Sequence, residues 1–310
     1  MLKDTNKTAF IFPGQGSQDI GMGKSLYMNS IAAREVFEEV DEILGKNLTD
    51  LMFDGQKDEL TRTENAQPAI LATSIALWRA MEESTGSLSR PDVVAGHSLG
   101  EYSALTVAGV FSITDAVSLV LERCKQMQIA CNKKPGGMAA FIGLDEISAL
   151  EICRESGTEI STINSPDQII IGGDHISLAM AIDLATSRGA RKAIPLKVDG
   201  AFHSCLMASA QDGLKNALDN IRFYDPIVPV IGNVTAKPLK TTNQIKKELE
   251  MQLTSCVQWN NSINMMLDSG VNQFYEIGHG KILSGILKRI DRSTTITSIS
   301  NYDDVDNYAN

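Results

Sequence analysis

The segment around Ser98 combines the residue types of a serine nucleophile with a tight turn. It reads Gly-His-Ser-Leu-Gly over residues 96–100, after an apolar run at 92–95 and before a helix-favouring stretch. A Gly-x-Ser-x-Gly motif between a strand and a helix is typical of a nucleophile elbow, whose glycines let backbone segments approach closely. A serine at the helix N-terminus would meet free N–H groups that favour developing negative charge. We predict that Ser98 is a nucleophile, and the alternative is a structural serine in a glycine-rich turn.

A serine nucleophile needs a base to take its proton, and the chain has four histidines. His203 lies where the chain re-enters a larger unit, and a seam between domains is a favoured place for a ligand cleft. His279 follows a predicted strand and is the main rival. His97 adjoins the serine and should point away from its hydroxyl, whereas His175 lies on a polar turn. We expect His203 to be the base and keep His279 as the alternative.

The spacing of apolar residues predicts the elements that must position these side chains. Strands are expected at 9–12, 92–95, 228–232 and 273–277, and helices at 31–44, 69–81, from 99 onward, at 116–127 and at 206–220. Short buried strands that alternate with helices indicate an α/β domain with a parallel sheet. We therefore predict a large α/β-hydrolase-like domain with a parallel core sheet. The polar tail at 301–310 is expected to fray.

Residues 137–198 show a different order of predicted strands and helices. The pattern predicts strands at 138–144, 160–163, 168–172 and 191–198, with helices at 146–155 and 176–187. Strand-helix-strand-strand-helix-strand is the split βαβ order of a ferredoxin-like unit. We predict a small ferredoxin-like subdomain over 137–198, inserted into a large domain formed by 1–136 and 199–310.

Composition excludes several classes of protein. The 310 residues carry a net charge of −10, which disfavours a general nucleic-acid binder. No apolar run approaches the roughly 20 residues that span a bilayer, and the N-terminus lacks the apolar core of a signal peptide. We therefore expect a cytoplasmic protein without a membrane partner. The five cysteines include no Cys-x-x-Cys pair, so reduced thiols are expected rather than a zinc site or a disulfide framework.

Further short motifs follow one another along almost the whole chain. They are Phe-Pro-Gly-Gln-Gly-Ser-Gln at 12–18, Glu-Asn-Ala-Gln-Pro-Ala at 64–69, Gly-His-Ser-Leu-Gly-Glu-Tyr at 96–102, Gly-Gly-Met-Ala-Ala at 136–140, Asn-Ser-Pro at 164–166, Gly-Ala-Phe-His-Ser at 200–204, Val-Gln-Trp at 257–259 and Glu-Ile-Gly-His-Gly-Lys at 276–281. In this order they resemble the malonyl-CoA:acyl carrier protein transacylase family, which includes the stand-alone acyltransferases of polyketide synthases.

The resemblance implies roles for residues of the site. Ser98 would attack the thioester carbonyl of malonyl-CoA, and His203 would be its base. Two backbone N–H groups, those of Gln15 and Leu99, would form the oxyanion hole. No acidic residue completes the pair in this family; a backbone carbonyl near the Val-Gln-Trp segment orients the imidazole instead, which implicates Gln258.

The resemblance also implies how the substrate is chosen. From its charged helical surroundings alone, Arg123 would be expected to be a solvated surface residue. The resemblance implies instead that it binds the free carboxylate of the malonyl group. Phe202 resembles the residue of malonyl-selective members, since its ring narrows the space that an α-methyl branch needs. Three positions depart from the family pattern, namely Cys124, Cys256 and His279. None of them is Ser98, His203 or Arg123, although His279 remains the alternative base.

The implied function is transfer of a malonyl group to the phosphopantetheine thiol of an acyl carrier protein through a malonyl-serine ester. No metal or redox cofactor is expected, and a monomer is expected. The carrier should be acidic, with Lys197, Arg191 and Lys192 as candidates for its docking patch. The alternatives are an editing acyl hydrolase and a non-catalytic scaffold. Fatty-acid and polyketide pathways share the motifs, although the Ala-Phe-His pattern and the cysteines slightly favour the second.

Overall fold

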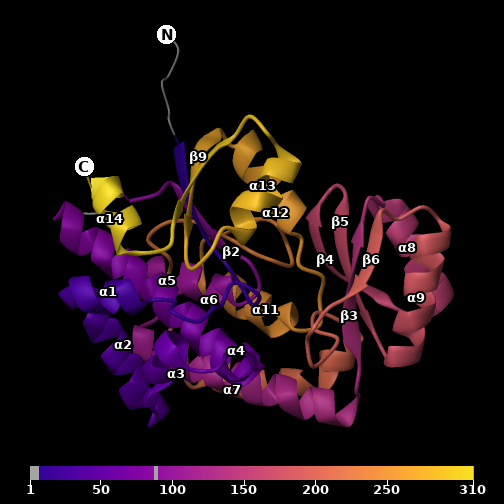
Figure 1. Cartoon of the computed structure of the whole chain (residues 1–310), viewed down its shortest axis with the longest axis horizontal. Coiled ribbons are helices and arrows are strands. Elements are labelled where there is room, and N and C mark those ends of the chain that lie inside the picture. Colours follow the sequence, from indigo (N-terminus) through magenta and orange to yellow (C-terminus); the bar gives the residue numbers. More distant parts are fainter. Residues whose placement is uncertain (1–6, 87–89, 310) are drawn as a thin grey trace.

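The computed structural model describes residues 7–86 and 90–309. Residues 1–6, which belong to the N-terminus that was predicted to lack a signal peptide, lie outside the described residues. The larger of its two sheets forms the centre of the molecule (Figure 1). Its strands in sheet order are β10 (Thr295–Ile299), β9 (Val271–Ile277), β1 (Lys7–Phe12), β2 (Val93–Gly96), β7 (Val230–Ile231) and β8 (Pro238–Leu239). Neighbouring strands are parallel except β7 and β8. The predicted parallel core sheet is therefore confirmed.

Helices cover both faces of this sheet, because its central strands are apolar on both sides. Phe10 and Phe12 of β1 pack into one hydrophobic cluster, whereas the alternate residues Ala9 and Ile11 pack into another. The helices are α1 (Lys24–Asn29), α2 (Ile31–Leu44), α3 (Leu48–Asp54), α4 (Lys57–Thr61), α5 (Thr63–Thr85), α6 (Gly100–Val107), α7 (Ile113–Lys133), the 3-10 helix Cys205–Ala210, α10 (Gln211–Asp219), α11 (Thr242–Gln252), α12 (Trp259–Asp268), α13 (Ile282–Ile290) and α14 (Tyr302–Ala309).

Two predictions about helices need correction. Helix α5 begins before Pro68, although a proline normally ends or kinks a helix. Most of α5 is buried, and this tertiary packing outweighs the local cost of the proline. The tail predicted to fray instead forms α14, in which Val305 is fully buried. The ring of Tyr308 also packs edge-on against Tyr275, with 5.2 Å between centroids.

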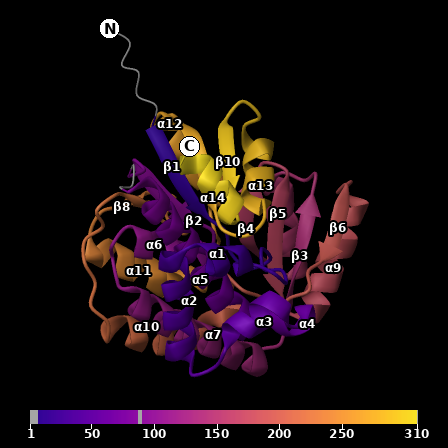
Figure 2. The same cartoon turned by 60° about the vertical axis from the view of Figure 1, so that its left-hand side comes forward.

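The small subdomain has the predicted ferredoxin-like order. It consists of β3 (Gly137–Ile142), α8 (Glu146–Ser156), β4 (Glu159–Ser165), β5 (Gln168–Gly173), α9 (His175–Ser187) and β6 (Lys192–Pro195). All neighbouring strands in the order β4-β5-β3-β6 are antiparallel. Figure 2 shows the sheet beside the large domain, with α9 on its outer side. The exact limits of 137 and 198 remain a prediction.

The open face of the small sheet is directed toward the large domain. Met138, Ala140 and Ile170 pack into the same cluster as Phe12, whereas the alternate strand residues pack under α8 and α9. A backbone bridge joins the two parts, since Ile163 N–H donates to the carbonyl of Val257 at 2.9 Å. The small sheet thus forms one wall of the space in front of β2 and α6.

No helix among the described residues is long and apolar enough to cross a membrane. All five cysteines are free, in agreement with the thiol prediction.

Candidate active site

The nucleophile motif forms a strained turn between β2 and α6. A β-carbon on Gly96 would lie 1.8 Å from the carbonyl oxygen of Gly100, and one on Gly100 would lie 2.1 Å from that of Phe12. No real β-carbon approaches a backbone oxygen so closely, so both positions require glycine. Ser98 itself has a positive φ of 53°. The turn therefore presents Ser98 at the start of α6, beside N–H groups that no preceding helical turn can satisfy.

The Ser98 hydroxyl lies 2.7 Å from Nε2 of His203, which comes from the loop after β6. The other ring nitrogen, Nδ1, donates to the backbone carbonyl of Gln252 at 2.8 Å. Because Nδ1 carries the hydrogen, Nε2 is free to accept the proton of Ser98. The structure thus joins two residues 105 positions apart into the pair that the motifs predicted.

The carbonyl that holds His203 belongs to Gln252, so the prediction of Gln258 is wrong. Gln252 is the last residue of α11, and the final carbonyls of a helix have no partner within it. The carbonyl of Gln258 is already engaged, because it accepts the N–H of Ser262 in the first turn of α12 at 2.9 Å. The helix C-terminus therefore supplies the free acceptor.

His203 is buried, which changes its protonation. Only 5% of the residue is exposed, and this burial, together with the nearby charge of Arg123, lowers the pKa of His203 to about 3. The imidazole is consequently neutral at ordinary pH and can take a proton from Ser98.

Arg123, on α7, is a buried cation directed at the nucleophile. It is 1% exposed, and its Nη2 donates to the Ser98 hydroxyl at 3.1 Å and to Oε1 of Gln252 at 3.0 Å. Nη1 donates to Oε1 of Gln67 at 2.6 Å. No carboxylate of the described residues lies within ion-pair distance of the guanidinium. Its charge is therefore available to an anionic group bound beside Ser98.

Gln15 and Leu99 lie in the same site. Both line the cleft with Ser98, and their backbone N–H groups have no acceptor among residues 7–86 and 90–309. The turn that carries Gln15 packs tightly on the elbow, since a β-carbon on Gly14 would lie 2.3 Å from the carbonyl oxygen of His97. This close packing places the backbone beside Gln15 against the elbow that carries Ser98 and Leu99.

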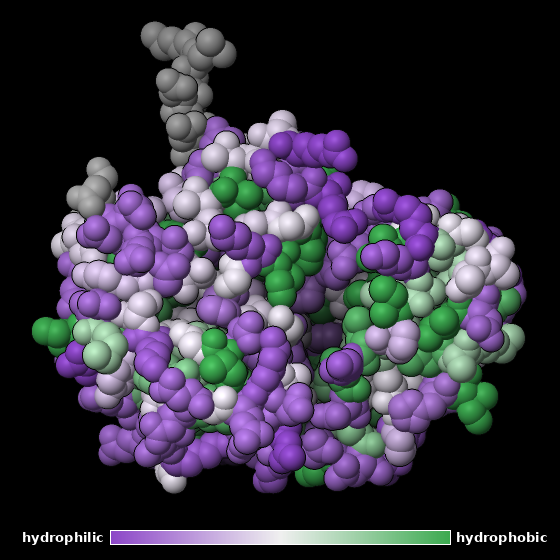
Figure 3. Space-filling view, viewed as in Figure 1, coloured by the Kyte–Doolittle hydropathy of each residue, from purple (hydrophilic) through white to green (hydrophobic). Residues whose placement is uncertain are grey.

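The cleft has a volume of about 410 Å³ and lies between the large domain and the small sheet. Figure 3 shows the molecule hollowed between these two parts. Phe202, which is 6% exposed, joins Met127 and Met138 in an apolar part of the wall. Lys197 stands on the same wall and is exposed. The cleft combines a narrow apolar interior with polar groups around Ser98.

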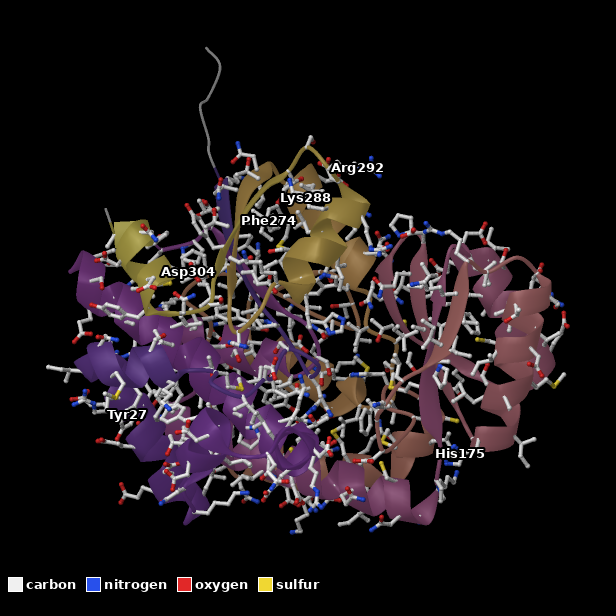
Figure 4. All side chains as sticks on the ribbon, in the orientation of Figure 1. Tyr27, His175, Phe274, Lys288, Arg292 and Asp304 are labelled. Carbon is white, nitrogen blue, oxygen red and sulfur yellow. The ribbon has the colours of Figure 1, made fainter. Side chains whose placement is uncertain are left out.

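The other histidines have different surroundings. His97 Nε2 lies 2.9 Å from Oδ1 of Asn164, and its ring packs against Trp259. His175 is exposed on the small subdomain, away from the centre of the molecule (Figure 4). His279 lines an adjoining cavity with Asp19 and Lys57. Burial lowers the pKa of His279, yet no contact with Ser98 is present among the described residues.

Asn233 is a site residue that sequence reasoning missed. Its Oδ1 accepts the N–H of Ser98 at 2.7 Å, and its Nδ2 donates to the carbonyl of Gly96 at 2.6 Å. Asn233 thereby links Gly96 and Ser98 across the first half of the strained turn. It follows β7 by two residues, and polar residues at the carboxyl ends of parallel strands commonly face a ligand site. Its position just after a predicted parallel strand was the signal in the sequence that could have identified Asn233 as a site residue.

The α/β fold, the elbow and the hydrogen bond between Ser98 and His203 fit an enzyme that transfers or hydrolyses acyl groups through a serine. The family model for the acyl transferase domain matches residues 9–302. A malonyl CoA-acyl carrier protein transacylase of Bacillus subtilis is 45% identical, over 95% of this chain and 94% of its own. The chain belongs to the malonyl-CoA:acyl carrier protein transacylase family.

Solved structures agree with this assignment. An acyl-carrier-protein S-malonyltransferase from Bartonella henselae is 42% identical with a TM-score of 0.94, covering 97% of this chain and 98% of its own. A malonyl-transacylase solved in complex with a type II polyketide synthase acyl carrier protein is 37% identical with a TM-score of 0.93, covering 96% and 97%.

Proposed function

We propose that this chain transfers a malonyl group from malonyl-CoA to the phosphopantetheine thiol of an acyl carrier protein, in fatty-acid or polyketide synthesis. The observation that carries the proposal is the buried Arg123 guanidinium, which reaches the Ser98 hydroxyl without an acid partner among the described residues. A malonyl group bound to Ser98 has its free carboxylate only two carbons from the ester carbonyl. Arg123 is therefore placed to bind that carboxylate.

In the first half-reaction, the Ser98 oxygen attacks the thioester carbonyl while His203 Nε2 takes the hydroxyl proton. The tetrahedral oxyanion receives hydrogen bonds from the N–H groups of Gln15 and Leu99, which stabilise its negative charge. The carbon–sulfur bond then breaks, and His203 returns the proton to the departing CoA thiolate. A malonyl-serine ester remains.

In the second half-reaction, the carrier thiol gives its proton to His203 and attacks the ester carbonyl. Collapse of the second oxyanion breaks the bond to the Ser98 oxygen, which recovers the proton from His203. Every proton that moves has its donor or acceptor in this pair, so no step requires a metal or redox cofactor.

The acidic carrier would approach the mouth of the cleft, where Lys197 is exposed. Lys192 is also exposed, whereas Arg191 is engaged with Asp167. Lys197 is therefore the strongest of the three docking candidates. Charge reversal at Lys197 should weaken the reaction with the carrier while leaving Ser98 acylation by malonyl-CoA intact.

The direct test uses radiolabelled malonyl-CoA. The wild-type protein should form a labelled ester at Ser98 and pass it to a holo-carrier thiol faster than to water, and Ser98→Ala should acquire no label. Formation of the ester followed mainly by release of free malonate would instead indicate an editing hydrolase. Absence of the ester in the wild-type protein would refute the proposed chemistry.

A further inference from the structure

Glu101 is a buried carboxyl group that the mechanism above does not use. It lies in the first turn of α6 and is fully buried. Its Oε1 accepts the backbone N–H of Asn233 at 3.1 Å, and its Oε2 accepts Nε2 of Gln252. These two partners are the residues that hold the Ser98 turn and the His203 ring. Glu101 therefore contacts both supports of the site without facing the substrate itself.

The side-chain amide of Gln252 is the link to the reacting groups. Its oxygen accepts Nη2 of Arg123, and its two N–H groups donate to the backbone carbonyl of Ser98 at 2.9 Å and to Glu101. A guanidinium is only a donor, so the amide oxygen must face Arg123. Turning the amide by 180° would place an NH₂ group against the guanidinium and lose this bond.

The orientation of that amide is set from the other side. The Ser98 carbonyl is only an acceptor, and both oxygens of Glu101 face N–H donors. In this arrangement both oxygens of Glu101 act as hydrogen-bond acceptors. Burial and the neighbouring charge of Glu248 raise the pKa of Glu101 well above its ordinary value, whereas the hydrogen bonds from Gln252 and Asn233 and the positive charge of Arg123 oppose that rise.

We propose that Glu101 is a positioning residue for malonyl selection. As an acceptor-only group it holds the Gln252 amide with its oxygen toward Arg123, and so keeps the guanidinium directed at Ser98. This inference rests on the proposed malonyl transfer. It explains why a carboxyl group occupies a fully buried place next to the elbow, where an apolar side chain would avoid the cost of desolvation.

Glu101→Gln tests the proposal because it changes almost no volume. One N–H of the new amide must then face either Asn233 N–H or the Gln252 NH₂ group, which puts donor against donor. Gln252 can relieve the conflict only by turning its own amide, which removes the acceptor from Arg123. The ratio of kcat/KM for Ser98 acylation by malonyl-CoA over acetyl-CoA should then fall by about tenfold or more, as expected for a lost hydrogen bond to a charged group.

Glu248→Gln is the matched control. Glu248 is a buried carboxyl like Glu101, and it contacts the loop that carries Asn233. Its oxygens accept hydrogen bonds from Val234 and Thr235, and no hydrogen bond joins it to Gln252 among the described residues. This variant should keep the malonyl-to-acetyl ratio of the wild-type protein even if its melting temperature falls. An equal loss of the ratio in both variants would show a general effect of removing a buried carboxyl, and would overturn the inference.

A double-mutant cycle shows whether Glu101 acts through Gln252. Gln252→Leu should lower the ratio by itself, and Glu101→Gln should add nothing in that background. If Glu101→Gln does not fold, an unchanged ratio in Gln252→Leu still overturns the proposal. Failure of the wild-type protein to acylate Ser98 would instead refute the proposed function, so the two failures are distinguishable.

Discussion

Replacing Arg123 by alanine should remove the preference for malonyl-CoA over acetyl-CoA. The guanidinium has five N–H donors, of which one reaches Gln67, one Gln252 and one the Ser98 hydroxyl. Nε has no partner in the described structure, and Nη1 has one further hydrogen. Nη1 and Nη2 form one fork, so a malonyl carboxylate can take the second Nη1 hydrogen and the Nη2 hydrogen that now faces Ser98, without displacing the two glutamine side chains that hold the cation.

The size of the effect follows from these bonds. Each hydrogen bond to a charged group contributes about 1.5–3 kcal/mol, so two contribute about 3–6 kcal/mol. That range corresponds to a loss of about 10²–10⁴ in kcat/KM for malonyl-CoA. Acetyl-CoA has no carboxylate, and its rate should change far less. The ratio of the two values should fall by most of this factor.

Single-turnover acylation, followed by the mass of the intact protein, measures both substrates on the same step. Arg123→Lys is the matched control, since it keeps the charge but cannot form two parallel bonds, and its ratio should lie between those of the wild-type and alanine proteins. An unchanged ratio in a folded Arg123→Ala protein would mean that the arginine does not select the substrate.

Three further outcomes follow from the site. Asn233→Leu leaves the Ser98 N–H buried without its acceptor, at a cost of about 1–3 kcal/mol, so rapid-quench acylation should slow by about 5–150-fold; an unchanged rate would contradict this role. The pKa of His203 is about 3 in the folded protein and 6.5 as its ordinary value. As the pH falls below 6.5, the unfolded chain therefore binds a proton at His203 that the folded protein does not bind. The contribution of His203 to stability, present above pH 6.5, should decline by about 1.7 kcal/mol between pH 6.5 and 5, measured as the difference in unfolding free energy between wild type and His203→Gln. Acylation kcat/KM should show no bend near pH 6.5, and such a bend would indicate an unshifted imidazole. Phe202→Ser should raise methylmalonyl-CoA use relative to malonyl-CoA by about 5–150-fold, for a methyl group worth about 1–3 kcal/mol, and equal ratios in both proteins would show that the ring does not limit the pocket.

Local patterns in the sequence predicted those features that depend on residues close together in the chain. The bounds of α2 match the predicted 31–44, and Gly96 and Gly100 lie where a tight turn allows no β-carbon. The ferredoxin-like order of the small subdomain followed from the spacing of its apolar residues. Steric and hydrogen-bond constraints within a few residues are sufficient for such features.

By itself, then, the sequence determined the elbow, the order of the elements and, through the ordered motifs, the family. Only the tertiary structure decided that Gln252 rather than Gln258 holds His203, that Asn233 supports the Ser98 turn and that the polar tail packs as α14. These partners lie far apart in the chain, since Ser98 and Asn233 are 135 positions apart. Which free carbonyl or amide meets a side chain depends on how whole helices pack, and no local pattern records that choice.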